Sequence, residues 1–261
     1  MSGLATRPPV VVVHPDAELL AQAVAARLLT RLLDVQSVRR PAHLVLTGGT
    51  IGIAVLAAVA TSTLRDAIDW SGVHVWWGDE RFLPTGDPER NETGARSALL
   101  DALGDAVPAE NVHPVPAPNR TGISTVEDAA AAYARELAGF PGDGAGPAVP
   151  AFDVLLLGMG PDGHVASLFP GHEALSVTGR SVVAVHGAPK PPPDRVSLTF
   201  EAIRAAREVW LVAAGTAKAA AVAAALDGAP DTPAAAAVGR SQTLWLLDAA
   251  SAPPPPQPSS S

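Results

Sequence analysis

The sequence predicts an α/β fold in which a parallel sheet is covered by helices on both faces. Short apolar runs alternate along the chain with longer segments whose apolar residues recur at helical spacing. This alternation is typical of parallel strands joined by right-handed crossover helices. Residues 154–157 form an unbroken apolar run, as expected of a strand buried on both faces. With 261 residues, the chain is long enough for one sizeable α/β domain.

The first half of the chain alternates strands and helices from residue 10 onward. A valine run predicts a strand at 10–13, and Asp16 is expected to cap a helix that reaches about residue 33. A short strand at 44–46 leads into a helix at 51–60. Residues 73–77 predict a third strand, and a helix is expected at 91–103.

The second half continues the same alternation. A weaker strand is expected among prolines at 112–115, and the capping-box pattern Ser124-Thr-Val-Glu127 begins an Ala-rich helix that Gly139 ends. After the strand at 154–157, helices are expected at 201–206 and 216–226. Further strands are expected at 181–185, 209–213 and 243–247. The alternation assigns these strands to the parallel sheet as well.

The chain is expected to divide into one folded domain and two ends. Residues 1–9 are expected to be flexible, and residues 10–248 to form a single α/β domain that carries the functional site. The Pro- and Ser-rich residues 249–261 are expected to be disordered, because such a tail cannot bury enough apolar surface to fold. Residues 140–150 are interpreted as a surface loop, since the alternation continues unchanged beyond them.

Composition limits the class of protein. The chain has no Cys, which excludes disulfides, thiolate catalysis and Cys-ligated metals. A net charge of −8 argues against nucleic-acid binding, which needs a basic face. No apolar run is long enough to span a bilayer, and the first residues lack the pattern of a signal peptide. We therefore expect a cytoplasmic globular protein with no nucleic-acid or membrane partner, and a monomer, with an oligomer left open.

The loop after the strand at 154–157 is the strongest candidate for a catalytic loop. Gly158, Gly160 and Gly163 let the backbone turn sharply where that strand ends, and open α/β sheets bind their ligands at this edge. Asp162 and His164 lie in the same turn. A lone His is usually structural, but a His in a Gly-rich turn directly after a buried strand is expected to be functional.

A second candidate loop joins the strand at 44–46 directly to the next helix. Its residues are Thr47, Gly48, Gly49 and Thr50. The first N–H groups of the helix and the two hydroxyls would suit one phosphate group. The alternative, a plain tight turn, explains the two glycines equally well.

Charged and polar residues also follow the strand at 73–77. Asp79, Glu80 and Arg81 are consecutive, and since they cannot all face one way, at least one is expected to point to solvent. Asn91 is expected to cap the next helix. An Arg at this edge can hold a phosphate or carboxylate bidentately, although a solvated turn is the simpler interpretation of the motif alone.

Two later cations, Arg195 and Lys218, lie near strand ends or helix starts. Lys218 in the first turn of a helix opposes the helix dipole, which favours an anionic ligand there, although either cation is equally consistent with an ordinary solvated side chain. Other chemistries are excluded: the seven His residues never show metal-ligand spacing, and there is no Gly-x-Ser-x-Gly elbow. Gly158-Met-Gly-Pro-Asp-Gly163 fits the dinucleotide pattern, but no acidic residue ends the next strand to hold a ribose.

The long motif Gly158-Met-Gly-Pro-Asp-Gly-His-Val-Ala-Ser-Leu-Phe-Pro-Gly171 resembles the signature of 6-phosphogluconolactonases, which hydrolyse the δ-lactone made in the first oxidative step of the pentose phosphate pathway. Gly78-Asp-Glu-Arg81, Asn91, Arg195 and Gly215-Thr-Ala-Lys-Ala219 follow in the family's order, so the resemblance covers about residues 10–247. It implies the Rossmann-like α/β fold shared with glucosamine-6-phosphate deaminases and ribose-5-phosphate isomerases.

The resemblance implies hydrolysis of 6-phospho-D-glucono-1,5-lactone to 6-phospho-D-gluconate, with no cofactor and no metal. His164 is expected to take a proton from the attacking water, with Asp162 orienting its ring and Arg81 or glycine N–H groups stabilising the oxyanion. Asp79 and Asn91 are expected to hold sugar hydroxyls or to brace Arg81. The remaining groups expected to bind substrate, at its phosphate, are Thr47, Gly48, Gly49, Thr50, Arg195 and Lys218.

Two alternatives to a lactonase remain open. One is an enzyme like glucosamine-6-phosphate deaminase on the same fold. The other is a non-catalytic sensor of sugar phosphates, although the chain shows no basic segment for a DNA-binding module. The presence of Asp162 together with His164 favours an enzyme over a sensor.

Overall fold

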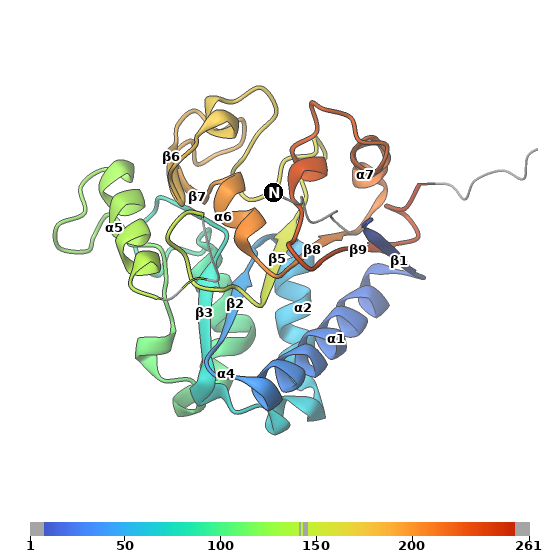
Figure 1. The fold of residues 1–261 in the computed structure, drawn as a ribbon, viewed down its shortest axis with the longest axis horizontal. Helices are drawn as coiled ribbons and strands as arrows, with labels where there is room; N and C mark the ends of the chain where they lie inside the picture. The colour runs from blue at the N-terminus through green and yellow to red at the C-terminus, as the bar shows by residue number, and fades with distance from the viewer. Residues whose placement is uncertain (1–7, 141, 143–145, 254–261) are drawn as a thin grey trace, which may run out of the picture.

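The computed structural model describes residues 8–140, 142 and 146–253 (Figure 1). Residues 1–9, expected to be flexible, and residues 249–261, expected to be disordered, lie largely outside these ranges. Both expectations stay predictions. Ser251, however, is buried, and its hydroxyl donates to the carbonyl of Ala213. The packed part of the chain therefore extends three residues beyond the predicted end at 248.

The main sheet is parallel, as predicted, and has the strand order β1-β9-β8-β5-β2-β3. Two central strands, β2 and β5, are almost completely buried, because residues on both of their faces are covered. The carboxyl ends of all these strands lie at one edge. The strands are β1 (Val10–His14), β2 (Ala42–Leu46), β3 (Val73–Trp77), β5 (Val154–Gly158), β8 (Glu208–Ala213) and β9 (Gln242–Asp248).

Helices cover both faces of this sheet, again as predicted. The long helices α1 (Ala17–Val38) and α2 (Gly49–Thr61) pack against each other (Figure 1), and α1 contacts the face on which Glu208 lies, through Arg31. The opposite face, which carries Trp76, is covered by α5 (Val126–Ala138). Asp16 caps α1 as expected, accepting from the N–H of Leu19. The shorter helices are α3 (Asn91–Ala95), α4 (Asp101–Leu103), α6 (Phe200–Ala205) and α7 (Ala219–Leu226).

Some local predictions are wrong. The capping box of α5 is formed by Thr125 and Asp128, one residue later than the expected pair Ser124 and Glu127. The expected strand at 112–115 is reduced to a single bridge between Val112 and Val75. The prolines around residue 115 explain the second error, since Pro cannot donate to a strand ladder.

A second, antiparallel sheet was not expected. It has the order β4-β7-β6 and consists of β4 (Asp79–Arg81), β6 (Val182–Val185) and β7 (Arg195–Leu198). The prediction that 181–185 belongs to the parallel sheet is therefore wrong, because β6 turns back through a loop and pairs with β7. The same sheet sets Arg81 opposite Arg195 and Asp79 opposite Ser197. It thus brings together predicted site residues that lie far apart in sequence.

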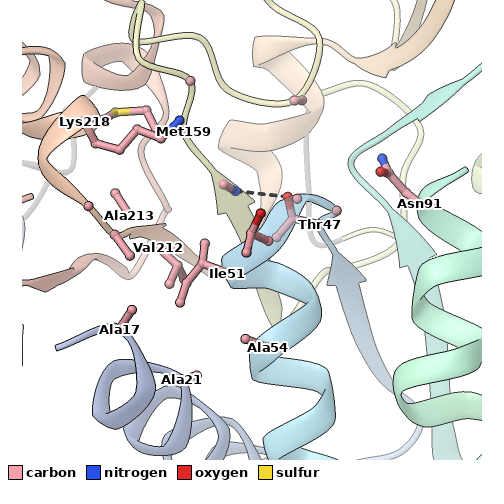
Figure 2. A pocket seen from close by; sticks show the side chains of 18 of the residues that line it. Ala17, Ala21, Thr47, Ile51, Ala54, Asn91, Met159, Val212, Ala213 and Lys218 are labelled. Carbon is pink, nitrogen blue, oxygen red and sulfur yellow. Dashed lines mark hydrogen bonds between the residues drawn. The ribbon is translucent and has the colours of Figure 1, made fainter. Parts of the chain in front are cut away.

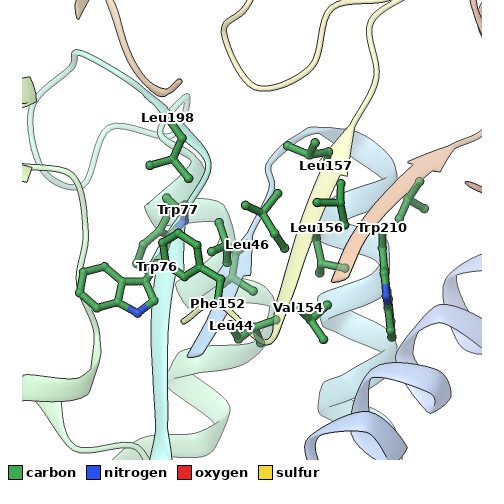
Figure 3. Close-up of a cluster of buried hydrophobic side chains, with 14 of the residues drawn as sticks. Leu44, Leu46, Trp76, Trp77, Phe152, Val154, Leu156, Leu157, Leu198 and Trp210 are labelled. Atoms are coloured by element: carbon green, nitrogen blue, oxygen red, sulfur yellow. The ribbon is translucent and has the colours of Figure 1, made fainter. Parts of the chain in front are cut away.

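The core lies around the central strands of the main sheet (Figure 3). Leu44, Leu156 and Trp210 are each at most 2 % exposed. Fully burying one side chain of this size stabilises the fold by about 1.5–3 kcal/mol, so this layer gives the strand ends above it a rigid base. In the part of the chain that the structure describes, no helix is both long and apolar enough to cross a membrane.

Candidate active site

A cavity of about 960 Å³ opens at the carboxyl edge of the main sheet, between α1, α2 and the loops after β2, β5 and β8 (Figure 2). Ala17, Ala21, Ile51 and Ala54 form an apolar wall toward α1 and α2, and Lys218 enters from the opposite side. All residues predicted for the site line the cavity except Asp162. These are Thr47, Gly48, Gly49, Thr50, Asp79, Arg81, Asn91, His164, Arg195 and Lys218.

Asp162 is exposed and does not line the cavity, but its carboxylate holds the ring of His164. Its Oδ1 atom is 2.5 Å from Nδ1 of His164, and the ring lies 4.5 Å from the ring of Phe169, centroid to centroid. A carboxylate next to Nδ1 favours the tautomer with the proton on that nitrogen. The other ring nitrogen, Nε2, is then an unprotonated base.

The protonation state of this pair is set by opposing effects. Burial lowers the pKa of His164 below its ordinary value, while the hydrogen bond to Asp162 and the charges of Asp162 and Asp79 raise it, and Lys190 lowers it. Burial raises the pKa of Asp162, but the hydrogen bond to His164, the charge of His164 and backbone hydrogen bonds together outweigh burial, and the net shift is downward. At neutral pH the pair is therefore a neutral imidazole held by a carboxylate, the form that a general base requires.

Glycines shape the loop that carries the pair. A Cβ atom on Gly160 would lie 2.0 Å from His164 Nδ1 and 2.3 Å from Asp162 Oδ1, so no other residue leaves room for them. Gly163 has a φ of 82°, and a Cβ there would meet the side chain of Thr232 at 2.6 Å. The glycine pattern read from the sequence thus serves the packing of the pair itself.

Asp79 faces the cavity and is fixed by two neighbours. Ser167 Oγ donates to Asp79 Oδ2 at 2.7 Å, and the amide of Asn91 donates to the backbone carbonyl of Asp79 at 2.8 Å and to Oδ1 at 3.3 Å. The prediction that Asn91 caps its helix is wrong, because the cap position is taken by Arg90. The side chain of Asn91 instead braces Asp79.

The prediction that at least one of Asp79, Glu80 and Arg81 points to solvent is wrong. Glu80 is buried, and neither Asp79 nor Arg81 is exposed. The Glu80 carboxylate is 1 % exposed and accepts from the backbone N–H groups of Arg81, Asn91 and Glu92 at 2.7–2.8 Å. It therefore does the capping that was assigned to Asn91. Burial raises the pKa of Glu80 to about 7, although Arg90 and these N–H groups oppose the shift.

Arg81 reaches the cavity from β4. Its guanidinium donates to the backbone carbonyl of Glu89, and the residue is only partly buried. Arg195 lies opposite Arg81 across the antiparallel sheet and is more deeply buried. Its guanidinium donates to the carbonyls of Lys190, Pro191 and Pro192. Arg195 therefore shapes the loop before β7 in addition to lining the cavity.

The loop from Thr47 to Thr50 begins α2 at the cavity floor. Thr47 Oγ1 accepts from the N–H of Gly158, which ties this loop to the end of β5 (Figure 2). Gly48 is the N-cap and has no side chain to occupy the first N–H groups of the helix. A Cβ on Gly48 would lie 1.9 Å from Asn91 Oδ1, so the close approach of the two loops requires glycine.

Two lysines face the cavity near the loop of His164. Lys218, in the turn before α7, was predicted; Lys190, in the loop that Arg195 shapes, was not. Burial and then the charge of Lys190 lower the pKa of Lys218, so the two cations are close enough to repel each other. Lys190 has only a weak sequence signal, a lone cation before the prolines 191–193. An anion between the two lysines would relieve their repulsion.

The arrangement suits an anionic substrate attacked by water. Among the described residues, no group of three or more His, Asp or Glu side chains is arranged to hold a metal ion. The site offers a neutral imidazole, a fixed carboxylate, several cations and the N-terminus of α2, all on one cavity. The sequence did not identify Ser167 as a site residue, although Ser167 lies within the long motif.

Comparison with known proteins places this chain among sugar-phosphate enzymes. Residues 15–245 match the family model of glucosamine-6-phosphate isomerases and 6-phosphogluconolactonases. A 6-phosphogluconolactonase of Streptomyces coelicolor is 58 % identical over 94 % of both chains. One of Mycobacterium tuberculosis is 47 % identical over 90 % of this chain and 94 % of its own.

Solved structures agree with these sequence matches. The structure of a 6-phosphogluconolactonase from Trypanosoma brucei matches with a TM-score of 0.82 at 28 % identity, over 94 % of this chain and 98 % of its own. A monomeric glucosamine-6-phosphate deaminase matches with a TM-score of 0.74 at 20 % identity, covering 93 % of this chain and 98 % of its own, which shows the shared fold alone.

Proposed function

The chain belongs to the family of glucosamine-6-phosphate isomerases and 6-phosphogluconolactonases, and from this premise we propose how its cavity works. The protein is a lactone-hydrolysing enzyme that converts 6-phospho-D-glucono-1,5-lactone to 6-phospho-D-gluconate, a step of the pentose phosphate pathway. The single observation that carries the mechanism is the imidazole of His164 at the cavity wall, held through Nδ1 by Asp162.

His164 acts as the general base. Its Nε2 removes a proton from water as the water oxygen attacks the lactone carbonyl carbon, giving a tetrahedral oxyanion. Arg81 or N–H groups of the glycine turn stabilise that oxyanion. The bond from this carbon to the ring oxygen then breaks, and the protonated His164 returns the proton to the ring oxygen. The carboxylic acid product ionises in water, and the enzyme returns to its starting state.

Asp162 keeps His164 in the productive tautomer and stabilises the imidazolium that forms. Burial keeps His164 neutral before the reaction, so that its basic nitrogen is available at and below neutral pH. Asp79, fixed by Asn91, holds a hydroxyl of the sugar ring. These roles require no cofactor and no metal ion.

The phosphate of the substrate lies between the loop of Thr47, Gly48, Gly49 and Thr50 and the cations across the cavity. The first N–H groups of α2 supply donors that suit a phosphate. Lys218 and Lys190 supply charge, and their mutual repulsion favours an anion between them. Arg195 contributes mainly by holding the loop of Lys190 through three backbone carbonyls.

The remaining properties follow the sequence expectations. We propose that residues 10–248 act as one catalytic unit, since each element contributing to the cavity packs on the same core. We further propose that the enzyme acts as a monomer in the cytoplasm. Size-exclusion chromatography with light scattering and cell fractionation test these two points.

The function is tested by following freshly made 6-phosphogluconolactone at neutral pH, with and without the protein, against spontaneous hydrolysis. Glucosamine 6-phosphate is assayed in parallel, with ammonia release as the readout. Acceleration of lactone loss alone supports the lactonase. Ammonia release would assign the protein to the deaminase branch, and inactivity on both substrates with tight sugar-phosphate binding would favour a sensor.

A further inference from the structure

Two buried serines lie beneath the loop of His164. Ser167 and Ser197 are both 0 % exposed. The N–H of Ser167 donates to Ser197 Oγ at 3.2 Å, and Ser197 Oγ donates to the carbonyl of Leu198 at 3.0 Å. Only the hydroxyl of Ser167 continues toward the cavity, donating to Asp79 Oδ2 at 2.7 Å.

Building on the proposed lactonase function, we propose that Ser167 is a positioning residue of the hydrolytic site, which fixes the Asp79 carboxylate at the cavity so that its charge supports His164. The hydrogen bond joins two parts of the chain that are 88 residues apart. It fastens the catalytic loop to β4 at the point where β4 enters the cavity.

The backbone before Ser167 is consistent with this role. Ala166 has a φ of 50°, in the left-handed region that residues with a Cβ avoid. This turn directs the chain inward directly after His164. Such conformations cost of order 1–3 kcal/mol and persist where the surroundings enforce them. Here the result is a buried hydroxyl within hydrogen-bond distance of Asp79.

Asp79 needs such a partner because cations also attract it. Its charge acts on His164, whose pKa it raises, and on Arg195, whose pKa it also raises against the effect of burial. Asn91 restrains mainly the backbone of Asp79, since its bond to the carboxylate is longer than its bond to the carbonyl. Ser167 makes the short bond to the carboxylate itself. Without it, the carboxylate can rotate away from His164.

A purely structural serine would behave differently, and Ser197 provides the matched control. Both serines are fully buried, and both belong to the hydrogen-bond network that runs from the N–H of Ser167 through Ser197 Oγ to the carbonyl of Leu198. Ser197, however, makes no bond to Asp79 through its side chain in the part of the chain that the structure describes. Ser167→Ala and Ser197→Ala should therefore lower the thermal stability similarly, but only the first should change the chemistry of His164.

The experiment compares Ser167→Ala, Ser197→Ala, Asp79→Asn and the double variant Ser167→Ala/Asp79→Asn in the lactone assay. We expect kcat to fall about 10- to 100-fold in Ser167→Ala, the value of a hydrogen bond to a charged group, and to stay within about 2-fold of wild type in Ser197→Ala. The double variant should be no slower than Asp79→Asn, because Ser167 acts through Asp79. Ser167→Cys, which keeps a weak donor, should fall between wild type and Ser167→Ala.

A second readout does not depend on activity. The pKa of His164, followed by NMR of its imidazole, should fall in Ser167→Ala and in Asp79→Asn, and should stay at its wild-type value in Ser197→Ala. Equal kcat and equal His164 pKa in the two serine variants would overturn the proposal, and so would additive losses in the double variant. A wild-type protein inactive on the lactone would refute the lactonase function alone, since the NMR comparison still decides the role of Ser167.

Discussion

Two histidine–carboxylate pairs in this molecule have similar geometry and opposite surroundings. His164 Nδ1 lies 2.5 Å from Asp162 Oδ1, and His113 Nδ1 lies 2.7 Å from Glu136 Oε1. In both pairs a carboxylate holds the same ring nitrogen. A search based on this contact alone would treat the two pairs as equal candidates for a general base.

Their surroundings separate them. The ring of His113 is stacked on Trp76 with the centroids 3.8 Å apart, and its Nε2 lies 2.8 Å from Nδ1 of His74. The ring of Phe140 meets that of His113 edge-on. Both ring nitrogens of His113 are thus occupied by protein groups. His164 lines a cavity of about 960 Å³ instead, and among the described residues its ring contacts a carboxylate through Nδ1 alone.

His43, which belongs to the same aromatic cluster as His113, shows what burial does without a carboxylate partner. Burial, followed by the neighbouring His74, lowers its pKa to about 3, and Trp76 donates to its Nδ1. It is a neutral, structural imidazole at physiological pH. The comparison teaches that a lowered pKa and a nearby carboxylate do not make a catalytic base unless a nitrogen also faces a substrate cavity.

The largest expected effect is the loss of His164. His164→Ala should lower kcat by about 10²–10⁴-fold, the usual contribution of a general base, while the melting temperature stays close to that of wild type. The drop in kcat is measured from the rate of lactone loss above the spontaneous rate. A variant with near-normal turnover would refute the assignment of the base.

Acid unfolding should depend strongly on His43 in the aromatic cluster. Because the pKa of His43 is lower in the folded state than its unfolded value near 6.5, the unfolded chain takes up a proton first as the pH falls. The contribution of His43 to stability is therefore complete above pH 6.5 and is lost between about pH 6.5 and 3, by roughly 5 kcal/mol. Urea unfolding at several pH values should show a shallower loss in His43→Phe. The same dependence of unfolding free energy on pH in His43→Phe and wild type would contradict the lowered pKa of His43.

Displacing His164 and Asp162 should lower kcat less than removing His164. In Gly160→Ala the new methyl group displaces both His164 and Asp162, which it would otherwise meet at 2.0 and 2.3 Å. A displacement of about 1 Å at a reacting group lowers kcat about 10²-fold. Gly146→Ala is the control, since a Cβ at that position meets nothing within 4 Å. Equal kcat in the two variants would show that the loop adapts freely.

The smallest effect is expected in the aromatic cluster. His113→Ala removes the ring stacked on Trp76 and the partner of Glu136, so the free energy of unfolding should fall by about 2 kcal/mol. Its kcat at a temperature well below unfolding should equal that of wild type. A loss of turnover comparable to that of His164→Ala would remove the distinction between the two pairs.

The sequence predicted the elements and the edge of the sheet that carries the site. The strand at 73–77 and the helical stretch at 91–103 match the structure, because a periodic apolar pattern reports burial directly. The predicted polar residues converge since parallel strands all end at the same edge. In this fold, a loop motif after a buried strand is therefore sufficient to locate the cavity.

What the sequence missed depends on contacts between distant segments. β4 has only three residues, all of them charged, so no apolar pattern indicates that it pairs with β7. Glu80 is buried because its partners are N–H groups of a helix that begins eleven residues later. The position of Lys190 depends on how Arg195 holds the preceding loop. Such contacts are tertiary, and they cannot be predicted from the local sequence.

Chemical rescue of His164→Ala by free imidazole tests the central claim most directly. The cavity has room for an added imidazole, and the enzyme-free rate at each imidazole concentration is subtracted. The mechanism predicts that lactone hydrolysis by His164→Ala rises in proportion to the neutral imidazole, while His113→Ala, active from the start, gains nothing. A rate in His164→Ala that imidazole leaves unchanged would contradict general-base catalysis at this position.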